Sequence, residues 1–109
     1  MRLVKMIKKL HDIINQYDDL MIKISSPDIM ADINKYKKLA REEKSLSPVI
    51  PKAKEYIQKF NQLKEDEEII QGDDKELKEI VKDEIGELKH DLEVLESELK
   101  ILLLPKDPN

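Results

Sequence analysis

The only two histidines of the chain, His11 and His90, are the first residues to consider for metal chemistry. Glu87-Leu88-Lys89-His90 has the Glu-x-x-His spacing that di-iron helical bundles use, but those sites need a second such motif and two further inward-facing glutamates. Lys8, not a glutamate, stands three residues before His11. Leu88 falls on the apolar seam of its helix, so Glu87 and His90 flank that seam. We therefore expect no metal site.

Carboxylates are the commonest candidate acid–base groups, and they lie in pairs along the last third of the chain: Glu76 with Glu79, Asp83 with Glu84, and Glu93 with Glu96. Such pairs catalyse when a cleft separates their pKa values. Here they alternate with lysines, as on a solvated helix face. The two glycines, Gly72 and Gly86, are isolated, so neither a phosphate-binding glycine loop nor a nucleophile elbow is present. We expect a protein that is not an enzyme and has no cofactor.

Charge is distributed unevenly, although the net charge is only −4. Residues 35–64 are strongly basic and residues 65–109 strongly acidic. Two explanations stay open: the segments attract each other when they fold side by side, or the basic segment also meets RNA. For the second, the candidate contacts are Lys37, Lys38, Arg41 and Lys44. Tyrosines among lysines can stack on bases, but we expect Tyr56 and Phe60, one turn apart beside Ile57, in the core.

Composition limits the class of protein. A chain of 109 residues is at most one domain, and 40% charged with 4% aromatic residues is typical of long helices or coiled coils. There is no cysteine, which excludes disulfides and thiolate metal sites. No apolar run approaches the ~18 residues of a membrane span, and no signal-peptide core is present. We expect a soluble cytoplasmic protein without a membrane partner.

Apolar spacing predicts the helices. From Asp73 onward, apolar residues alternate at steps of four and three, the seam of a helix packed along its length: Val81, Ile85, Leu88, Leu92, Leu95, Leu99 and Leu102. A first helix is expected from Leu3 to Ile24 on a similar seam: Leu3, Ile7, Leu10, Ile14, Tyr17, Met21 and Ile24, flanked by Met6, Ile13 and Leu20. A second is expected from Asp28 to Leu46, with Ser26 or Asp28 as its cap.

Turn residues predict where the helices end. Pro27 stops the first helix. Ser47 as N-cap with Pro48 at the first helical position predicts a new helix start. Yet Leu39, Leu46, Ala53 and Phe60 keep a spacing of seven across the prolines, which favours a kink over a reversal. Gly72 is placed to end the next helix in a left-handed conformation, and Asp73 with Glu76 resembles a capping box. The predicted fold is all-α, an elongated antiparallel three-helix, coiled-coil-like bundle whose middle helix is kinked or split near Ser47–Pro51.

The end of the chain resembles a known family. Leu102-Leu103-Leu104-Pro105-Lys106-Asp107-Pro108-Asn109 is similar to the segment that closes the N-terminal helical domain of bacterial class-I peptide chain release factors, especially the branch that reads UAA and UAG. The pattern Tyr36-x-x-Leu39-x-Arg41-Glu42-x-x-x-Leu46-Ser47-Pro48-Val49 resembles that family's second helix. Leu95-Glu96-x-Glu98-Leu99-Lys100 resembles its last helix, as do Asp73, Glu76 and Leu77. The UGA-reading sister factor usually lacks the Pro-Lys-Asp-Pro run.

The resemblance implies a function in translation termination without catalysis by this part. The family's Gly-Gly-Gln and Pro-x-Thr tripeptides are absent, and the chain has no threonine. We therefore expect residues 1–104 to be the N-terminal helical domain of a release factor and residues 105–109 to begin the linker to missing decoding and catalytic domains. The implied partners are the ribosome near its stalk base, those missing domains, and a release-factor GTPase. A homodimer of the fragment is possible. The alternative is a free-standing coiled-coil oligomerisation or adaptor module.

Overall fold

The computed structural model describes residues 2–104, with side chains from residue 5 onward. Residues 105–109, which include the Pro-Lys-Asp-Pro run and the expected linker, lie outside the described residues. The helices are α1 (Arg2–Ile24), α2 (Pro27–Met30), α3 (Ile33–Leu46), α4 (Val49–Ile70) and α5 (Lys75–Leu102). No strand occurs in the described part of the chain, and the predicted all-α class is confirmed. The chain divides into two compact units, residues 1–53 and residues 54–109.

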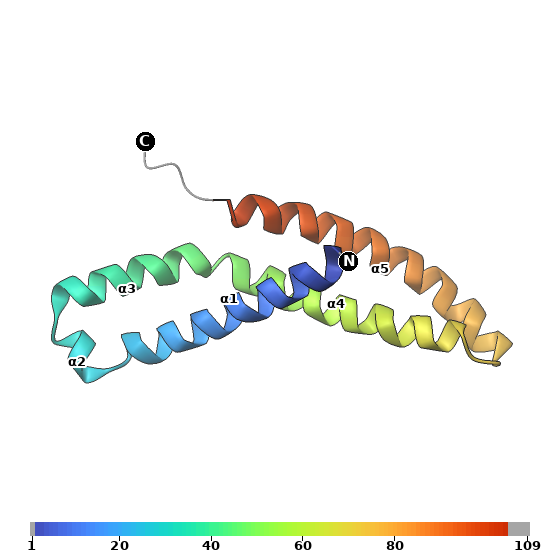
Figure 1. The fold of residues 1–109 in the computed structure, drawn as a ribbon, viewed down its shortest axis with the longest axis horizontal. Helices are drawn as coiled ribbons and strands as arrows, with labels where there is room; N and C mark the ends of the chain where they lie inside the picture. The colour runs from blue at the N-terminus through green and yellow to red at the C-terminus, as the bar shows by residue number, and fades with distance from the viewer. Residues whose placement is uncertain (1, 105–109) are drawn as a thin grey trace. The chain divides into compact units, whose positions relative to one another are not determined.

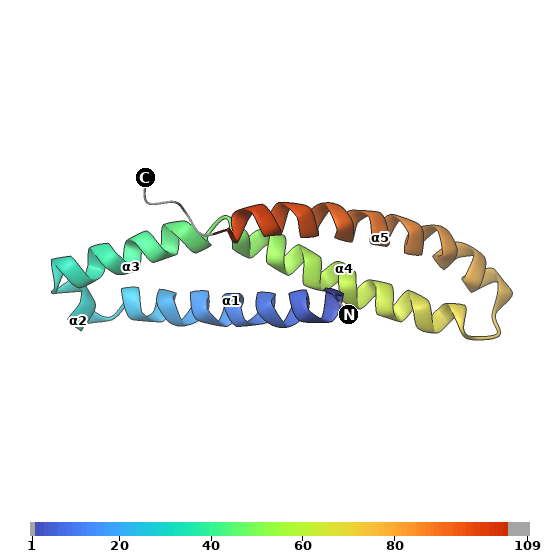
Figure 2. The ribbon, with the colours of Figure 1, turned by 45° about the horizontal axis from the view of Figure 1, so that its top comes forward.

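In the first unit, α1 and α3 run side by side in opposite directions, joined through the short α2 (Figures 1 and 2). Among the side chains of α1 that the structure describes, Leu10, Ile13 and Leu20 are buried and Tyr17 is half-buried. Met21, expected on the seam, is 40% exposed. The buried stripe of α1 is thus rotated toward Ile13 and Leu20, which the spacing had placed at the flank of the seam. A stripe wide enough for two partners does not decide which edge is covered.

The helix expected from Asp28 to Leu46 is interrupted, which corrects the prediction. Asp32 adopts an extended conformation, and its carboxylate accepts hydrogen bonds from the backbone amides of Asn34 and Lys35 at 3.1 and 3.2 Å. Asp32 therefore caps α3 by satisfying two amides that have no partner inside the helix. Ser26 precedes α2 in an extended conformation, but its side chain makes no capping hydrogen bond.

The middle helix is split where the prolines begin. Ser47 keeps a right-handed helical conformation, and its amide donates to the carbonyl of Glu43 at 2.8 Å. It therefore ends α3 and does not cap the next helix as expected. α4 begins at Val49, one residue after Pro48, which has no amide hydrogen to continue the ladder.

In the second unit, α4 and α5 form an antiparallel pair (Figures 1 and 2). The seam predicted for α5 is confirmed in its central part, where five residues are buried: Val81, Leu88, Leu92, Leu95 and Leu99. Ile85 is half-buried, and Leu102 is 37% exposed. On α4 the buried residues of this unit include Tyr56, Phe60 and Leu63.

The turn between α4 and α5 differs from the expected one. Gly72 does not have a positive φ; its amide donates to the carbonyl of Ile69 at 3.0 Å, three residues back. This tight bond closes the last turn of α4 without a left-handed residue. The cap of α5 is Asp74, whose carboxylate accepts from the amide of Leu77 at 3.1 Å. The expected cap, Asp73, is wrong by one position.

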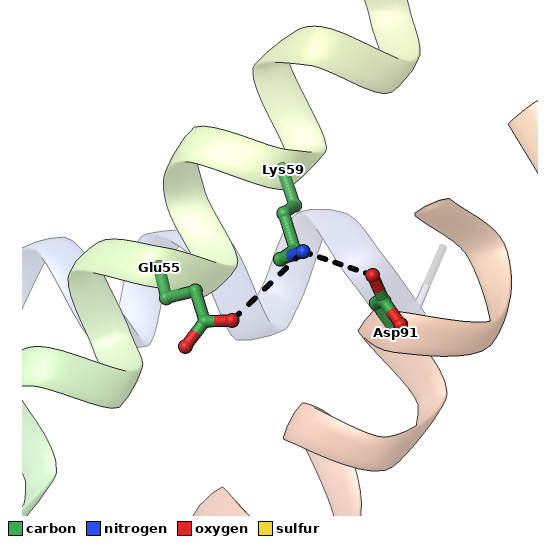
Figure 3. Close-up of polar contacts among 3 residues, drawn as sticks. All are labelled: Glu55, Lys59 and Asp91. Atoms are coloured by element: carbon green, nitrogen blue, oxygen red, sulfur yellow. Dashed lines mark hydrogen bonds and ion pairs between the residues drawn. The ribbon is translucent and has the colours of Figure 1, made fainter. Parts of the chain in front are cut away.

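An ion pair marks the register of the two helices. The ammonium of Lys59 on α4 lies 2.9 Å from Oδ2 of Asp91 on α5 and 3.9 Å from Oε2 of Glu55 one turn earlier (Figure 3). The hydrogen bond to Asp91 raises the pKa of Lys59. Lys59 and Asp91 therefore mark positions that face each other across the antiparallel pair.

Candidate nucleic-acid interface

The candidate site is a basic face on α3. Residues at helical spacing line a shallow hollow of about 330 Å³ on this face: Tyr36, Lys37, Ala40, Arg41, Glu43 and Lys44. Ala40 adds little bulk to this lining because its side chain is a single methyl group. Three of the four predicted contacts, Lys37, Arg41 and Lys44, therefore come together beside an aromatic ring.

Lys38, the fourth predicted contact, does not line the hollow. Successive residues of an α-helix are rotated by about 100°, which carries Lys38 past Lys37 and away from Tyr36. Lys38 is exposed. The hollow is therefore lined by three of the four predicted contacts, and Lys38 lies outside it.

The orientation of α3 is held by a hydrogen bond from α1. The hydroxyl of Tyr17 donates to Oε2 of Glu43 at 2.8 Å. This bond, with smaller contributions from burial and from the charge of Glu43, raises the pKa of Tyr17. Since α3 contains no fully buried residue, this link helps to decide which of its faces points outward. It also occupies the acidic group at the edge of the hollow.

The basic residues of this face are not neutralised within the described residues. No ion pair or hydrogen bond there engages the side chains of Lys37, Arg41 or Lys44. Lys59, from the same basic segment, instead pairs with Asp91 on the acidic helix. Both explanations of the charge distribution thus have a structural counterpart: Lys59 binds the acidic helix, and Lys37, Arg41 and Lys44 remain available on α3.

The aromatic residues of the basic segment are also divided between the surface and the core. Tyr36 is 41% exposed, whereas Tyr56 is fully buried and Phe60 nearly so, which confirms the expectation that Tyr56 and Phe60 are core. Burial, with the negative charge of Glu96, raises the pKa of Tyr56 to about 12. Tyr36, Tyr56 and Phe60 all lie in the basic segment, and of these three only Tyr36 is exposed enough to stack on a base.

The Glu-x-x-His spacing that was considered for metal binding lies on the surface of α5. Glu87 and His90 are both exposed. Within residues 2–104 the structure brings together no group of three or more histidine, cysteine, aspartate or glutamate side chains that would hold a metal ion. No helix in that range is long and apolar enough to cross a membrane.

One polar residue was missed by sequence reasoning. Asp66 is 1% exposed, and Gln62 donates to its Oδ1 at 3.0 Å. The signal was present, since Asp66 follows the buried Leu63 by three residues, where the helical spacing calls for an apolar side chain. By sequence alone, Asp66 is only a member of the acidic segment, residues 65–109.

Fold and surface together define an all-helical domain whose most distinctive surface is a basic, tyrosine-bearing helix face. The family profile of the PCRF domain matches residues 13–109, and the chain belongs to this family. The match includes α3 and its basic face.

Curated relatives agree with that family. The chain is 44% identical to peptide chain release factor 1 of Alkaliphilus oremlandii over 106 residues, 95% of this chain and 30% of the relative. It is 43% identical to peptide chain release factor 1 of Campylobacter concisus over 101 residues, 93% of this chain and 28% of the relative. The chain thus spans about three tenths of the length of these relatives. No solved structure matches it significantly.

Proposed function

We propose that this chain takes part in translation termination, as the ribosome-binding helical domain of a peptide chain release factor. The observation that carries the proposal is membership of the PCRF family together with about 40% identity to peptide chain release factor 1 over nearly the whole chain. In this proposal residues 1–104 bind and do not catalyse, residues 105–109 begin the linker to further domains, and the protein works in the cytoplasm. The alternative of a free-standing adaptor has no comparable support.

The basic face of α3 is the proposed contact with ribosomal RNA. Lys37, Arg41 and Lys44 would neutralise phosphates and release counterions, while Tyr36 offers a ring on which an unpaired base can stack. The availability of these cations and the exposure of Tyr36 support this assignment. Contact with the stalk base, contact with a release-factor GTPase, and a homodimer of the fragment belong to the same proposal.

The test is the salt dependence of ribosome binding. The labelled 109-residue chain is titrated with bacterial ribosomes at several KCl concentrations, and log K is plotted against log of the salt concentration. Replacing Lys37, Arg41 and Lys44 together by alanine should lower the magnitude of the slope by about 2.1–2.7, since each lost phosphate contact contributes about 0.7–0.9.

Two controls make the result specific. The triple alanine variant of Lys5, Lys8 and Lys9, exposed residues of α1, removes the same charge from another helix. The single variant Lys38→Ala removes a charge from α3 outside the hollow. Both should keep the wild-type slope. If all variants had the slope of the wild type, the α3 face would be excluded as the RNA contact, but the proposed role in termination would still stand. A wild-type chain that does not bind ribosomes would refute the proposed domain function itself.

A further inference from the structure

Asp66 on α4 is a buried charged residue with an incomplete set of partners. Its side chain is 1% exposed, and the amide of Gln62 donates to Oδ1. Its other oxygen, Oδ2, is buried and receives no hydrogen bond. A buried carboxylate oxygen without a donor is strongly destabilising, so a partner for Oδ2 is needed.

The helix register identifies what faces Asp66. Lys59 and Asp91 face each other across the antiparallel pair, as their 2.9 Å contact demonstrates. Moving seven residues forward on α4 leads to Asp66, and moving seven residues back on α5 leads to Glu84. Seven residues are two turns, about 10 Å, on either helix. The same register therefore places Glu84 opposite Asp66.

Two ionised carboxylates cannot bond to each other, because both only accept hydrogen bonds. The interaction of Asp66 with Glu84 therefore requires a proton. Asp66, as a hydrogen-bond acceptor within reach of a protonated Glu84, is the largest cause that raises the pKa of Glu84, followed by burial and by the charges of Asp66 and Glu87. Among the described residues, no basic side chain acts on Glu84 to oppose these effects.

We propose that Asp66 and Glu84 share one proton, so that the Glu84 carboxyl donates to Oδ2 of Asp66 and joins α4 to α5. A proton fits this site better than a metal ion, since no group of three metal-ligating side chains forms in the described part of the chain. The α4–α5 hairpin thereby contains a carboxyl–carboxylate hydrogen bond that forms at low pH. This bond lies two helical turns from the Lys59–Asp91 ion pair. This inference is independent of the proposed function.

The sign of the pH dependence follows from the raised pKa of Glu84. The folded chain holds a proton that the unfolded chain releases near pH 4.5, the ordinary value. Stability from the shared proton is complete below that value and is lost as the pH rises through the raised pKa of the folded state. Between the pKa of the unfolded state and the raised pKa of the folded state, binding of this one proton changes the equilibrium constant for unfolding by at most about tenfold per pH unit.

The experiment measures urea unfolding of the 109-residue chain from pH 4.5 to pH 8. The Glu84→Gln variant carries an amide that donates to Asp66 at every pH, so its stability should vary less with pH than that of the wild type. Glu93→Gln, an exposed position on α5, is the matched control and should retain the wild-type pH dependence. A Glu84→Gln curve parallel to the wild-type curve would overturn the proposal.

A site-resolved measurement removes the ambiguity of bulk stability. Carbon-detected NMR of the side-chain carboxyl should give a midpoint for Glu84 above 4.5 in the wild type and a lower one in Asp66→Asn. An unchanged midpoint in Asp66→Asn would refute the pairing. Mg²⁺ is added at pH 7 as a separate probe; selective stabilisation of the wild type over Glu84→Gln would mean that the pair holds a cation and that the proton proposal is wrong.

Discussion

Gly86 offers the clearest test of the physical reasoning on α5. It lies inside the helix, where glycine is about 0.8–1 kcal/mol less favourable than alanine. A methyl group built at this position meets no atom within 4 Å apart from its own helix backbone and chain neighbours. No steric penalty therefore offsets the gain in helix propensity. We expect Gly86→Ala to stabilise the chain by about 0.5–1 kcal/mol.

Gly72 supplies the matched contrast. A methyl group at Gly72 would lie 3.2 Å from the carbonyl oxygen of Ile69, a backbone atom that already accepts the amide of Gly72. Both glycines have ordinary φ values, so backbone strain does not distinguish the two substitutions. We expect Gly72→Ala to give no gain.

Urea denaturation followed by circular dichroism measures both variants. With a slope of about 2 kcal/mol per molar urea, the midpoint of Gly86→Ala should rise by about 0.3–0.5 M at unchanged slope. A lower midpoint for Gly86→Ala would refute the reasoning and would mean that another surface packs on Gly86. A larger gain at Gly72 than at Gly86 would refute it equally.

Two tyrosine variants test the other polar contacts. Tyr17→Phe removes the hydrogen bond to Glu43 and should lower thermal stability at neutral pH. Because this bond raises the pKa of Tyr17, the higher thermal stability of the wild type should persist at pH 10. It should vanish only above the raised pKa. An advantage already lost below pH 10 would contradict that assignment. Tyr56→Phe removes a buried hydroxyl that has no hydrogen-bond partner, so it should be neutral or stabilise by up to about 1 kcal/mol. A loss above 1 kcal/mol in thermal unfolding would show that the hydroxyl has a partner.

Local features of the sequence predicted the helices well. The spacing of Leu88, Leu92, Leu95 and Leu99 determined their burial, because an α-helix of this pattern has only one apolar stripe to cover. The first helix was likewise expected at Leu3–Ile24 and extends from Arg2 to Ile24. Three members of the basic face could be found from composition and charge, since their positions on one helix follow from its pitch.

Helix ends were predicted less well, because neighbouring residues of the same type compete for one role. Asp73 and Asp74 are both able to cap α5, and only the path of the turn selects Asp74. Gly72 tolerates a left-handed conformation but does not use it, since a bond to Ile69 closes the helix first. Asp32 was overlooked as a cap because the apolar pattern continues on both sides of it.

Tertiary structure alone decided which polar groups are buried or engaged. Lys59 and Lys37 belong to the same basic segment, yet only Lys59 meets an acidic partner on α5. Asp66 and Glu67 are adjacent carboxylates on one helix, and only Asp66 is turned into the contact with α5. The sequence determines the period of each helix and therefore which residues share a face. The rotation of one helix against its neighbour, set by packing between segments distant in the chain, determines which face loses contact with water.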